Sequence, residues 1–201
     1  MTVAARQYSL RSTDTVWDYA AWKELPDDGN RYEIIDGVLY MTTAPSNFHQ
    51  YIVGNLTGLV GWPFQQTGAG FWFTAPIGLL IPGCDPVQPD FLLVRAERRT
   101  IIANRRIRGV PDLIVEVLSP GNRAQDTVVK RAAYARASLP EYWIVRPDTR
   151  DILVYTAPEP AASDFSAVQR FASDTVLTSP TIAGMTLDVA ALFAGAPDTT
   201  L

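Results

Sequence analysis

The segment PDLIVEVLS, from Pro111 to Ser119, places a carboxylate inside an otherwise apolar run. Its β-branched residues, without polar alternation, predict a strand that is buried on both faces near the centre of a sheet. Glu116 lies in the middle of this run. A buried charge is costly unless it is paired or binds a metal ion. The fold must therefore supply Glu116 with a partner. That partner is a metal ion or, in the alternative interpretation, a buried arginine in a structural salt bridge.

The N-terminal part of the sequence predicts a helix, a hairpin and a second helix. Ser12 to Asp14 precede TVWDYAAWKEL and are expected to cap a helix there, because short oxygen-bearing side chains accept hydrogen bonds from free backbone N–H groups. RYEIIDGVLYMTT indicates two strands around Asp36-Gly37, since glycine tolerates the positive φ of a tight turn. A second helix is expected after Pro45, where apolar residues recur at helical spacing.

The rest of the sequence predicts more strands and two helices. Short apolar runs broken by glycine and proline between Gly68 and Val94 indicate strands with tight turns. The segment AERRTIIANRRIRG is interpreted as a basic loop or short helix, TVVKRAAYARAS as a helix, and EYWIVRP and DILVYTA as strands. Weaker strands near 166–177 and a short helix in LDVAALFAG complete the pattern. We therefore predict an α/β fold in which helices flank a mixed sheet.

The length of 201 residues fits one domain, with a core at about 30–156 and a C-terminal extension at 157–201. Cys84 is the only cysteine, so an intramolecular disulfide is impossible, and no histidine cluster accompanies it to suggest zinc. The sequence has neither a secretory signal pattern nor a run approaching the roughly 20 apolar residues of a membrane span. These features predict a cytoplasmic protein that does not enter a membrane.

The charge distribution is uneven, although the formal net charge is -4. Residues 95–136 contain ten basic and four acidic residues, which gives this stretch +6 and leaves -10 on the remainder. A basic middle within an acidic chain is typical of a local phosphate-binding surface. The alternative is a solvated, arginine-rich loop and helix face.

Asp90 opens a second apolar strand, FLLV, and is the first candidate partner for Glu116. Carboxylates on neighbouring strands can converge on Mg²⁺, which prefers oxygen ligands and usually takes one or two carboxylates. Such a site can activate water and neutralise charge on a phosphodiester. An aspartate after proline can also serve only as a turn or cap residue. Asp112 follows a proline too, but it lies roughly 13 Å along the strand from Glu116, too far to share one ion.

Five further polar residues are candidates for the site. Lys130 is one of only two lysines against fifteen arginines, which suggests a place where a compact ammonium is needed. Asp126, Lys130 and Tyr134 share one helix face, although a surface ion pair beside a packed tyrosine is the alternative. Glu33 lies on the first hairpin strand and points either into the site or into solvent. His49 is the only histidine, and capping or packing is its more common role.

These segments resemble the Uma-two family, bacterial proteins of the restriction-endonuclease-like PD-(D/E)XK superfamily. The resemblance runs from about Tyr32 to Tyr155. It is carried by YEIIDGVLY, the AP…H stretch, VQPDFLLV, the closing Tyr155 strand and the specific segment PDLIVEVLSPGNRAQDTVVKRAAYARASLPEYWIV. It implies a restriction-endonuclease-like core with an N-terminal helix and hairpin, and a site for Mg²⁺, with Mn²⁺ as a substitute. Two positions depart from the pattern. Leu118 stands where E-x-K would place its lysine, and Arg146 stands where the family more often has aspartate.

The resemblance implies roles for individual residues. Asp90 and Glu116 correspond to the metal-binding pair, Glu33 to an additional N-terminal glutamate, and Lys130 to a lysine that has migrated to the following helix. The resulting hypothesis is a Mg²⁺-dependent endonuclease acting on DNA, with a homodimer as a plausible assembly for cutting both strands. The alternatives are a non-catalytic DNA-binding or assembly module and a hydrolase of smaller phosphate esters. Accessory roles are expected for His49, Asp126 and Tyr134, and backbone phosphate contacts for Arg105, Arg106, Arg108, Arg123 and Arg131.

Overall fold

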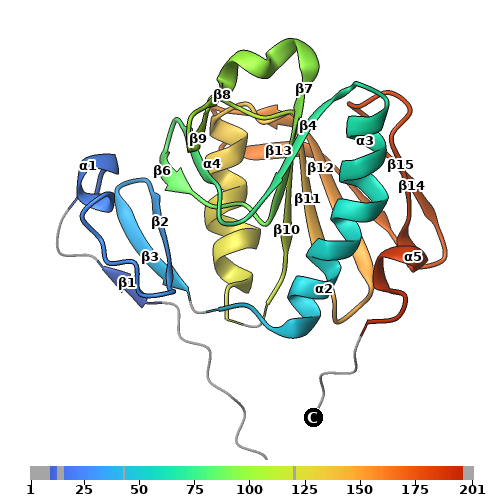
Figure 1. Cartoon of the computed structure of the whole chain (residues 1–201), viewed down its shortest axis with the longest axis horizontal. Coiled ribbons are helices and arrows are strands. Elements are labelled where there is room, and N and C mark those ends of the chain that lie inside the picture. The colour runs from blue at the N-terminus through green and yellow to red at the C-terminus, as the bar shows by residue number, and fades with distance from the viewer. Residues whose placement is uncertain (1–9, 13–15, 43, 120, 197–201) are drawn as a thin grey trace, which may run out of the picture.

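A computed structural model describes residues 10–12, 16–42, 44–119 and 121–196 of the chain. It contains two large β-sheets and a small ribbon, with helices on both sides of the second sheet (Figure 1). The predicted α/β class with a mixed sheet is confirmed, but the strands form two large sheets where one was expected. The reason is that the N-terminal hairpin does not join the sheet that contains the Glu116 strand. It pairs with strands from the middle of the chain.

The seven-stranded sheet has the order β1-β3-β2-β6-β5-β9-β8. Its strands are β1 (Leu10–Ser12), β2 (Arg31–Ile35), β3 (Val38–Thr42), β5 (Gly78–Ile81), β6 (Cys84–Val87), β8 (Ile102–Ala103) and β9 (Arg106–Arg108). The β2–β3 hairpin confirms the turn predicted at Asp36-Gly37. Both residues have positive φ, 50° and 74°, as a two-residue hairpin turn of type I′ requires.

The six-stranded sheet has the order β13-β12-β11-β10-β7-β4 and contains the predicted central strand. Its strands are β4 (Gly70–Thr74), β7 (Phe91–Arg95), β10 (Leu113–Val117), β11 (Glu141–Arg146), β12 (Asp151–Glu159) and β13 (Asp164–Phe171). Every residue of β10 is buried, because β10 pairs with β11 and β7 at its two edges and its side chains pack into a hydrophobic core on each face of the sheet. Its apolar sequence therefore reflects burial on both faces, as predicted.

Helices cover both faces of this sheet. On one face lie α2 (Asn47–Leu56), the π-helical turn η1 (Thr57–Gly61), α3 (Trp62–Gln66) and α5 (Val189–Phe193). On the other face lies a continuous helical segment made of the π-helical turn η3 (Gln125–Lys130) and α4 (Arg131–Arg136) (Figure 1). Alternate β10 residues face the two sides, so Val115 and Val117 pack toward α2, and Ile114 belongs to the core around α4.

The predicted start of the first helix was wrong. Ser12 is the last residue of β1, where it pairs with Leu39 of β3, while Thr13 and Asp14 lie outside the described residues. The helix α1 spans only Tyr19–Trp22 and is capped by Asp18, whose side chain accepts a hydrogen bond from Ala21 N at 2.8 Å. The hairpin thus gains an edge strand that ends at Ser12, one of the residues predicted to cap the helix. A 3-10 helix, η2 (Ala96–Ile101), occupies part of the predicted basic loop.

Residues beyond 156 contribute to the same core as the rest of the chain. β12 runs to Glu159, β13 forms an edge of the six-stranded sheet, and a ribbon of β14 (Val176–Thr178) and β15 (Thr186–Asp188) leads into α5. The predicted helix in LDVAALFAG is thereby confirmed. Glu141 of β11 ties this segment to the sheet, because its buried carboxylate accepts hydrogen bonds from the side chains of Ser179 and Thr181. No helix within the described ranges is long and apolar enough to span a lipid bilayer.

Candidate active site

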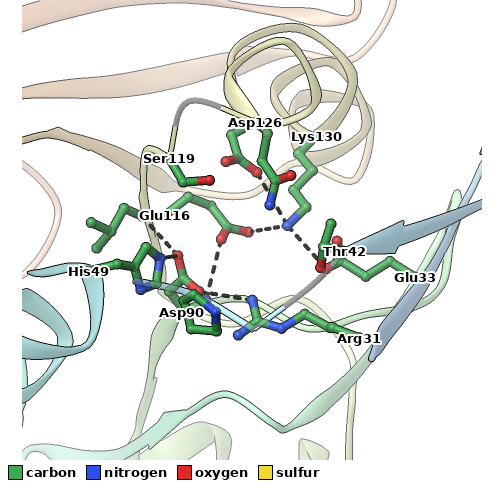
Figure 2. Close-up of a pocket in the computed structure, with 12 residues that line it drawn as sticks. Arg31, Glu33, Thr42, His49, Asp90, Glu116, Ser119, Asp126 and Lys130 are labelled. Atoms are coloured by element: carbon green, nitrogen blue, oxygen red, sulfur yellow. Dashed lines mark hydrogen bonds and ion pairs between the residues drawn. The ribbon is translucent and has the colours of Figure 1, made fainter. Parts of the chain in front are cut away.

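Four predicted site residues line one small cavity of about 20 Å³ (Figure 2). Glu33 comes from β2, Asp90 directly precedes β7, Glu116 lies in β10 and Lys130 ends η3. Each is at most 3% exposed. The register of the sheet explains the meeting of the two strand carboxylates. Phe91 pairs with Val115, so the preceding residue, Asp90, lies beside Glu116, and Asp90 N donates to Glu116 Oε2 at 3.3 Å.

Lys130 is the cation at the centre of the carboxylates. Its Nζ lies 3.0 Å from Glu33 Oε1, 3.0 Å from Glu116 Oε1 and 3.3 Å from Asp126 Oδ1. One turn further along the helix, the Tyr134 hydroxyl donates to Glu116 Oε1 at 3.0 Å. The predicted shared face of Asp126, Lys130 and Tyr134 therefore points into the protein. A surface ion pair is excluded as the explanation of this spacing, because all three residues are buried.

Asp90 is held by three donors. Arg31 Nη1 lies 2.9 Å from Asp90 Oδ1, His49 Nε2 lies 2.9 Å from Oδ2, and Val117 N donates to Oδ2 at 2.9 Å. His49 reaches the site from the first turn of α2, where its backbone N–H is capped by Ser46 Oγ. Arg31 was not predicted. Its position two residues before Glu33 on the same strand, and hence on the same face, is the signal that identifies it in retrospect.

Glu33 points inward and is fixed by two amide groups. Its Oε1 accepts a hydrogen bond from Gln88 N at 2.7 Å, and its Oε2 accepts one from Gln125 Nε2 at 2.9 Å. Both glutamines are buried. Together with Lys130, these contacts orient both carboxylate oxygens of Glu33, and the solvent-facing alternative is thereby excluded.

The cluster contains more negative than positive charge. Glu33, Asp90, Glu116 and Asp126 are four carboxylates, whereas Arg31 and Lys130 are the permanent cations, so the ionised cluster carries −2 before any charge on His49 is counted.

The carboxylates respond unequally to this environment. Burial raises the pKa of Glu116 well above its usual range. The charge of Lys130 lowers this pKa, but repulsion from the neighbouring carboxylates raises it further. Burial likewise raises the pKa of Asp126 to about 7. Burial also opposes ionisation of Asp90, but the hydrogen bond from His49 and the charge of Arg31 outweigh it and hold the pKa of Asp90 below its usual range. Asp90 is thus the carboxylate best prepared to carry a charge.

The donor set fits one hard divalent cation better than a closed metal cage. When all four carboxylates are ionised, the excess charge of −2 matches Mg²⁺, the available ligands are oxygens, and a cavity of about 20 Å³ holds one water-sized particle. Within the described ranges, however, no three or more His, Cys, Asp or Glu side chains form a ready-made metal-binding group. Asp90 and Glu116 are therefore the pair that fits, since Mg²⁺ usually takes one or two protein carboxylates and keeps several waters.

The predicted phosphate-binding arginines do not line the cavity. Arg123 pairs with Asp148 at 2.5 Å, and Arg131 pairs with Asp164 at 3.2 Å. Arg105, Arg106 and Arg108 line a separate hollow beside α1. Much of the excess positive charge of residues 95–136 is thus neutralised by carboxylates from other parts of the chain.

Two further sequence features have structural explanations. Asp112 accepts hydrogen bonds from Arg95 N at 2.8 Å and Arg98 Nη1 at 3.0 Å, so it anchors the basic segment and lies outside the cavity, as its distance along the strand predicted. Arg146, which departs from the family pattern, pairs across the β11–β12 register with Asp151. Its guanidinium binds both oxygens of that buried carboxylate, so the substitution has a partner on the neighbouring strand.

Comparison with known proteins agrees with this geometry. The model of the Uma2 family, described as "Putative restriction endonuclease", matches residues 18–190. The chain belongs to the Uma2 family. This match includes every residue of the cavity described above and extends the resemblance seen in the sequence at both ends. Membership in this family supports a nuclease activity for the protein.

A solved structure shares the fold of this Uma2 protein. The crystal structure of a "putative nuclease belonging to DUF820" from Anabaena variabilis ATCC 29413 superposes with a TM-score of 0.72 and 17% sequence identity. The similarity covers 88% of the present chain and 97% of that chain. At this identity the comparison establishes the fold alone. No curated protein matches the chain.

Proposed function

We propose that this Uma2 protein is a Mg²⁺-dependent endonuclease that hydrolyses phosphodiester bonds in DNA. The observation that carries the proposal is the buried cluster of four carboxylates and two permanent cations around a cavity that holds one small particle. A structural salt bridge would balance its charges. An excess of −2 in a buried site is costly unless a cation or protons compensate it.

Asp90 and Glu116 are the residues that would hold Mg²⁺ or, in its place, Mn²⁺. When bound, the ion would neutralise charge on the phosphodiester and generate a nucleophile from water at neutral pH. The protein prepares this pair by hydrogen bonding. Arg31, His49 and Val117 N fix Asp90, while Lys130 and Tyr134 fix Glu116.

Glu33 and Lys130 are assigned to the reacting groups. Both oxygens of Glu33 are oriented by neighbouring donors, so this carboxylate can accept a hydrogen bond from the attacking water and fix its direction. Lys130 provides the compact positive charge that a pentavalent phosphate requires. It does so from the helix that follows β10, which compensates for Leu118 at the E-x-K lysine position.

One observation favours a second candidate, a DNA-binding or assembly module without catalytic activity. Lys130 already contacts three carboxylates, an arrangement that neutralises much of the cluster without a metal ion. Such a module would retain the nuclease fold, and its buried cluster would serve as a structural ion-pair network.

The deciding experiment is cleavage of plasmid, single-stranded DNA and RNA with Mg²⁺ or Mn²⁺ by the wild type and Glu116→Gln. The amide keeps the shape of Glu116 but removes its charge, so cleavage is expected to fall at least a hundredfold. Asp148→Asn is the matched control, because Asp148 is an exposed carboxylate outside the cavity and its loss should leave cleavage unchanged. A wild type that cleaves none of these substrates would support the non-catalytic module.

A further inference from the structure

A second hollow, lined by different residues from the catalytic cavity, lies between α1 and β9. Its volume is about 420 Å³, and it shares no lining residue with the cavity around Glu116. Four cations and two aromatic rings form most of its wall, namely Lys23, Arg105, Arg106, Arg108, Tyr19 and Trp22. We call the space lined by these residues the α1–β9 hollow. The proposed nuclease chemistry does not use it.

Within the part of the chain that the structure describes, the four cations of the hollow have no acidic partner, which distinguishes them from most other cations of the fold. The other arginines around the fold are mostly salt-bridged, including Arg31 in the active site and Arg146 in the sheet. Among the cations whose side chains the structure describes, those without a salt bridge are Lys23, Arg99, Arg105, Arg106, Arg108 and Arg150. Four of these six meet in one place, although the whole chain carries a net charge of -4.

The aromatic rings hold these cations in position. Tyr19 and Trp22 stack with centroids 6.1 Å apart, and the Arg106 guanidinium lies 5.3 Å from the first ring and 4.8 Å from the second. Arg106 Nε also donates to the Tyr19 hydroxyl at 2.8 Å. Lys23 and Arg108 lie 5.6 and 5.9 Å from the Tyr19 ring. Like charges gathered in this way repel one another, so the arrangement is best stabilised by an anion that bridges them.

We propose that the α1–β9 hollow binds the phosphate backbone of a nucleic-acid strand and serves as an anchoring site separate from the catalytic cavity. Guanidinium groups match phosphate oxygens in a fork geometry, and partly exposed aromatic rings beside them suit the sugar and base of the same strand. This inference rests on the proposed function for its choice of ligand, because an anchored strand is what a nuclease of this fold would need to retain.

The hollow and the active site are attached to one strand of the protein. Trp22 Nε1 donates to the carbonyl of Tyr32 at 2.8 Å, and Tyr32 immediately precedes Glu33 in β2. A nucleic acid long enough to reach from one site to the other would be held at both, whereas a short oligonucleotide bound at the active site would leave the hollow empty. Removing the anchor should raise KM for long substrates and leave kcat unchanged, since Lys23 and Arg108 do not touch the reacting groups.

The experiment measures DNA and RNA binding by fluorescence anisotropy in EDTA at several salt concentrations. All proteins carry Glu116→Gln, so that the nucleic acid is not cleaved during the measurement. Each lost phosphate contact should lower the slope of log K against log[salt] by about 1, so Arg108→Ala should lower it by about 1 and Lys23→Ala/Arg108→Ala by about 2. Neither side chain makes a hydrogen bond in the structure, so both variants should fold. Arg99→Ala is the charge-matched control, because Arg99 is exposed and unpaired but does not line the hollow.

The possible results separate this inference from the proposed function. Equal slopes for Arg108→Ala and Arg99→Ala would overturn the anchoring site. Competition by polyglutamate as strong as competition by DNA would also overturn it, in favour of an acidic peptide as the ligand. A wild type that binds long DNA through the hollow but cleaves nothing would leave the anchoring site standing and refute the nuclease.

Discussion

Asp126→Asn should stabilise the metal-free protein, although it removes an ion pair with Lys130 from the core. Asp126 lies 3.3 Å from Lys130, but Lys130 also serves Glu33 and Glu116, and one ammonium does not compensate three buried carboxylates. Burial therefore raises the pKa of Asp126 from 3.8 to about 7. The ionised aspartate is less stable in the folded protein than in the unfolded chain, and an uncharged asparagine of the same shape avoids that cost.

The expected magnitude follows from this shift. A pKa raised in the folded state adds stability that is fully present below pH 3.8 and is lost as the pH rises through 7. At about 1.4 kcal/mol per unit, the wild type loses on the order of 4 kcal/mol over this window, whereas the asparagine variant does not titrate. The stability of the variant relative to wild type should therefore increase steadily from pH 4 to pH 7 and then level off.

Urea denaturation in EDTA at pH 4.5, 6, 7 and 8 would measure this difference. Asp148→Asn is the control, because an exposed aspartate should give a small difference that does not change over this range. With Mg²⁺ the gap should narrow, since a bound cation stabilises the ionised wild-type cluster more than the neutralised one. A variant that is less stable than wild type at pH 7, or a difference independent of pH, would refute the charge-excess reasoning.

Three other predictions test the site and the scaffold. Asp90→Asn should abolish the heat of Mg²⁺ binding in calorimetry, whereas Asp112→Asn should retain it. Loss of binding in both variants would mean that binding was lost through unfolding and not through loss of a metal ligand. Glu141→Ala should lower the unfolding free energy by about 3 kcal/mol, because it leaves several buried donors without an acceptor; a Tm shift of less than 2 °C would contradict the role of Glu141 as an anchor. Burial opposes ionisation of Asp151, but hydrogen bonds from Arg146 and its other partners lower its pKa to about 2, so its contribution to stability is present above pH 3.8 and lost as the pH falls through 2. Acid titration of Asp151→Asn should lack this component, and an unchanged acid transition would disprove the assignment.

Local patterns were sufficient to predict the strand elements that carry the site. The apolar run around Glu116 indicated a strand buried on both faces, and the structure confirms this for every residue of β10. Asp36-Gly37 predicted the hairpin turn, because few residue pairs adopt positive φ at two successive positions and Asp-Gly is one of them. The spacing of Asp126, Lys130 and Tyr134 predicted a shared helix face. In each case the information lies within about ten residues of sequence.

Features that depend on distant partners were not predictable in the same way. The first helix was misplaced because Ser12 suits a cap as well as an edge strand, and only pairing with Leu39 decides between them. Arg31 was missed because its partner, Asp90, lies 59 residues away. The basic stretch looked like a single surface because sequence cannot reveal that Asp148 and Asp164, from distant parts of the chain, neutralise two of its arginines. Charge that is local in sequence becomes informative only when its partners in space are known.

The geometry around Lys130 explains why a lysine stands at this position in a chain rich in arginine. Its ammonium offers three N–H donors from one atom, and three carboxylate oxygens lie within 3.3 Å of it. A guanidinium is planar and spreads its donors over three nitrogens, so it would not reach three converging oxygens in a cavity of about 20 Å³. At the α1–β9 hollow the requirement is reversed, because stacking on Tyr19 and Trp22 favours a flat cation, and Arg106 fills that place. The two sites thus favour different cations at their central positions for physical reasons, a compact one where carboxylates converge and a planar one where aromatic rings stack.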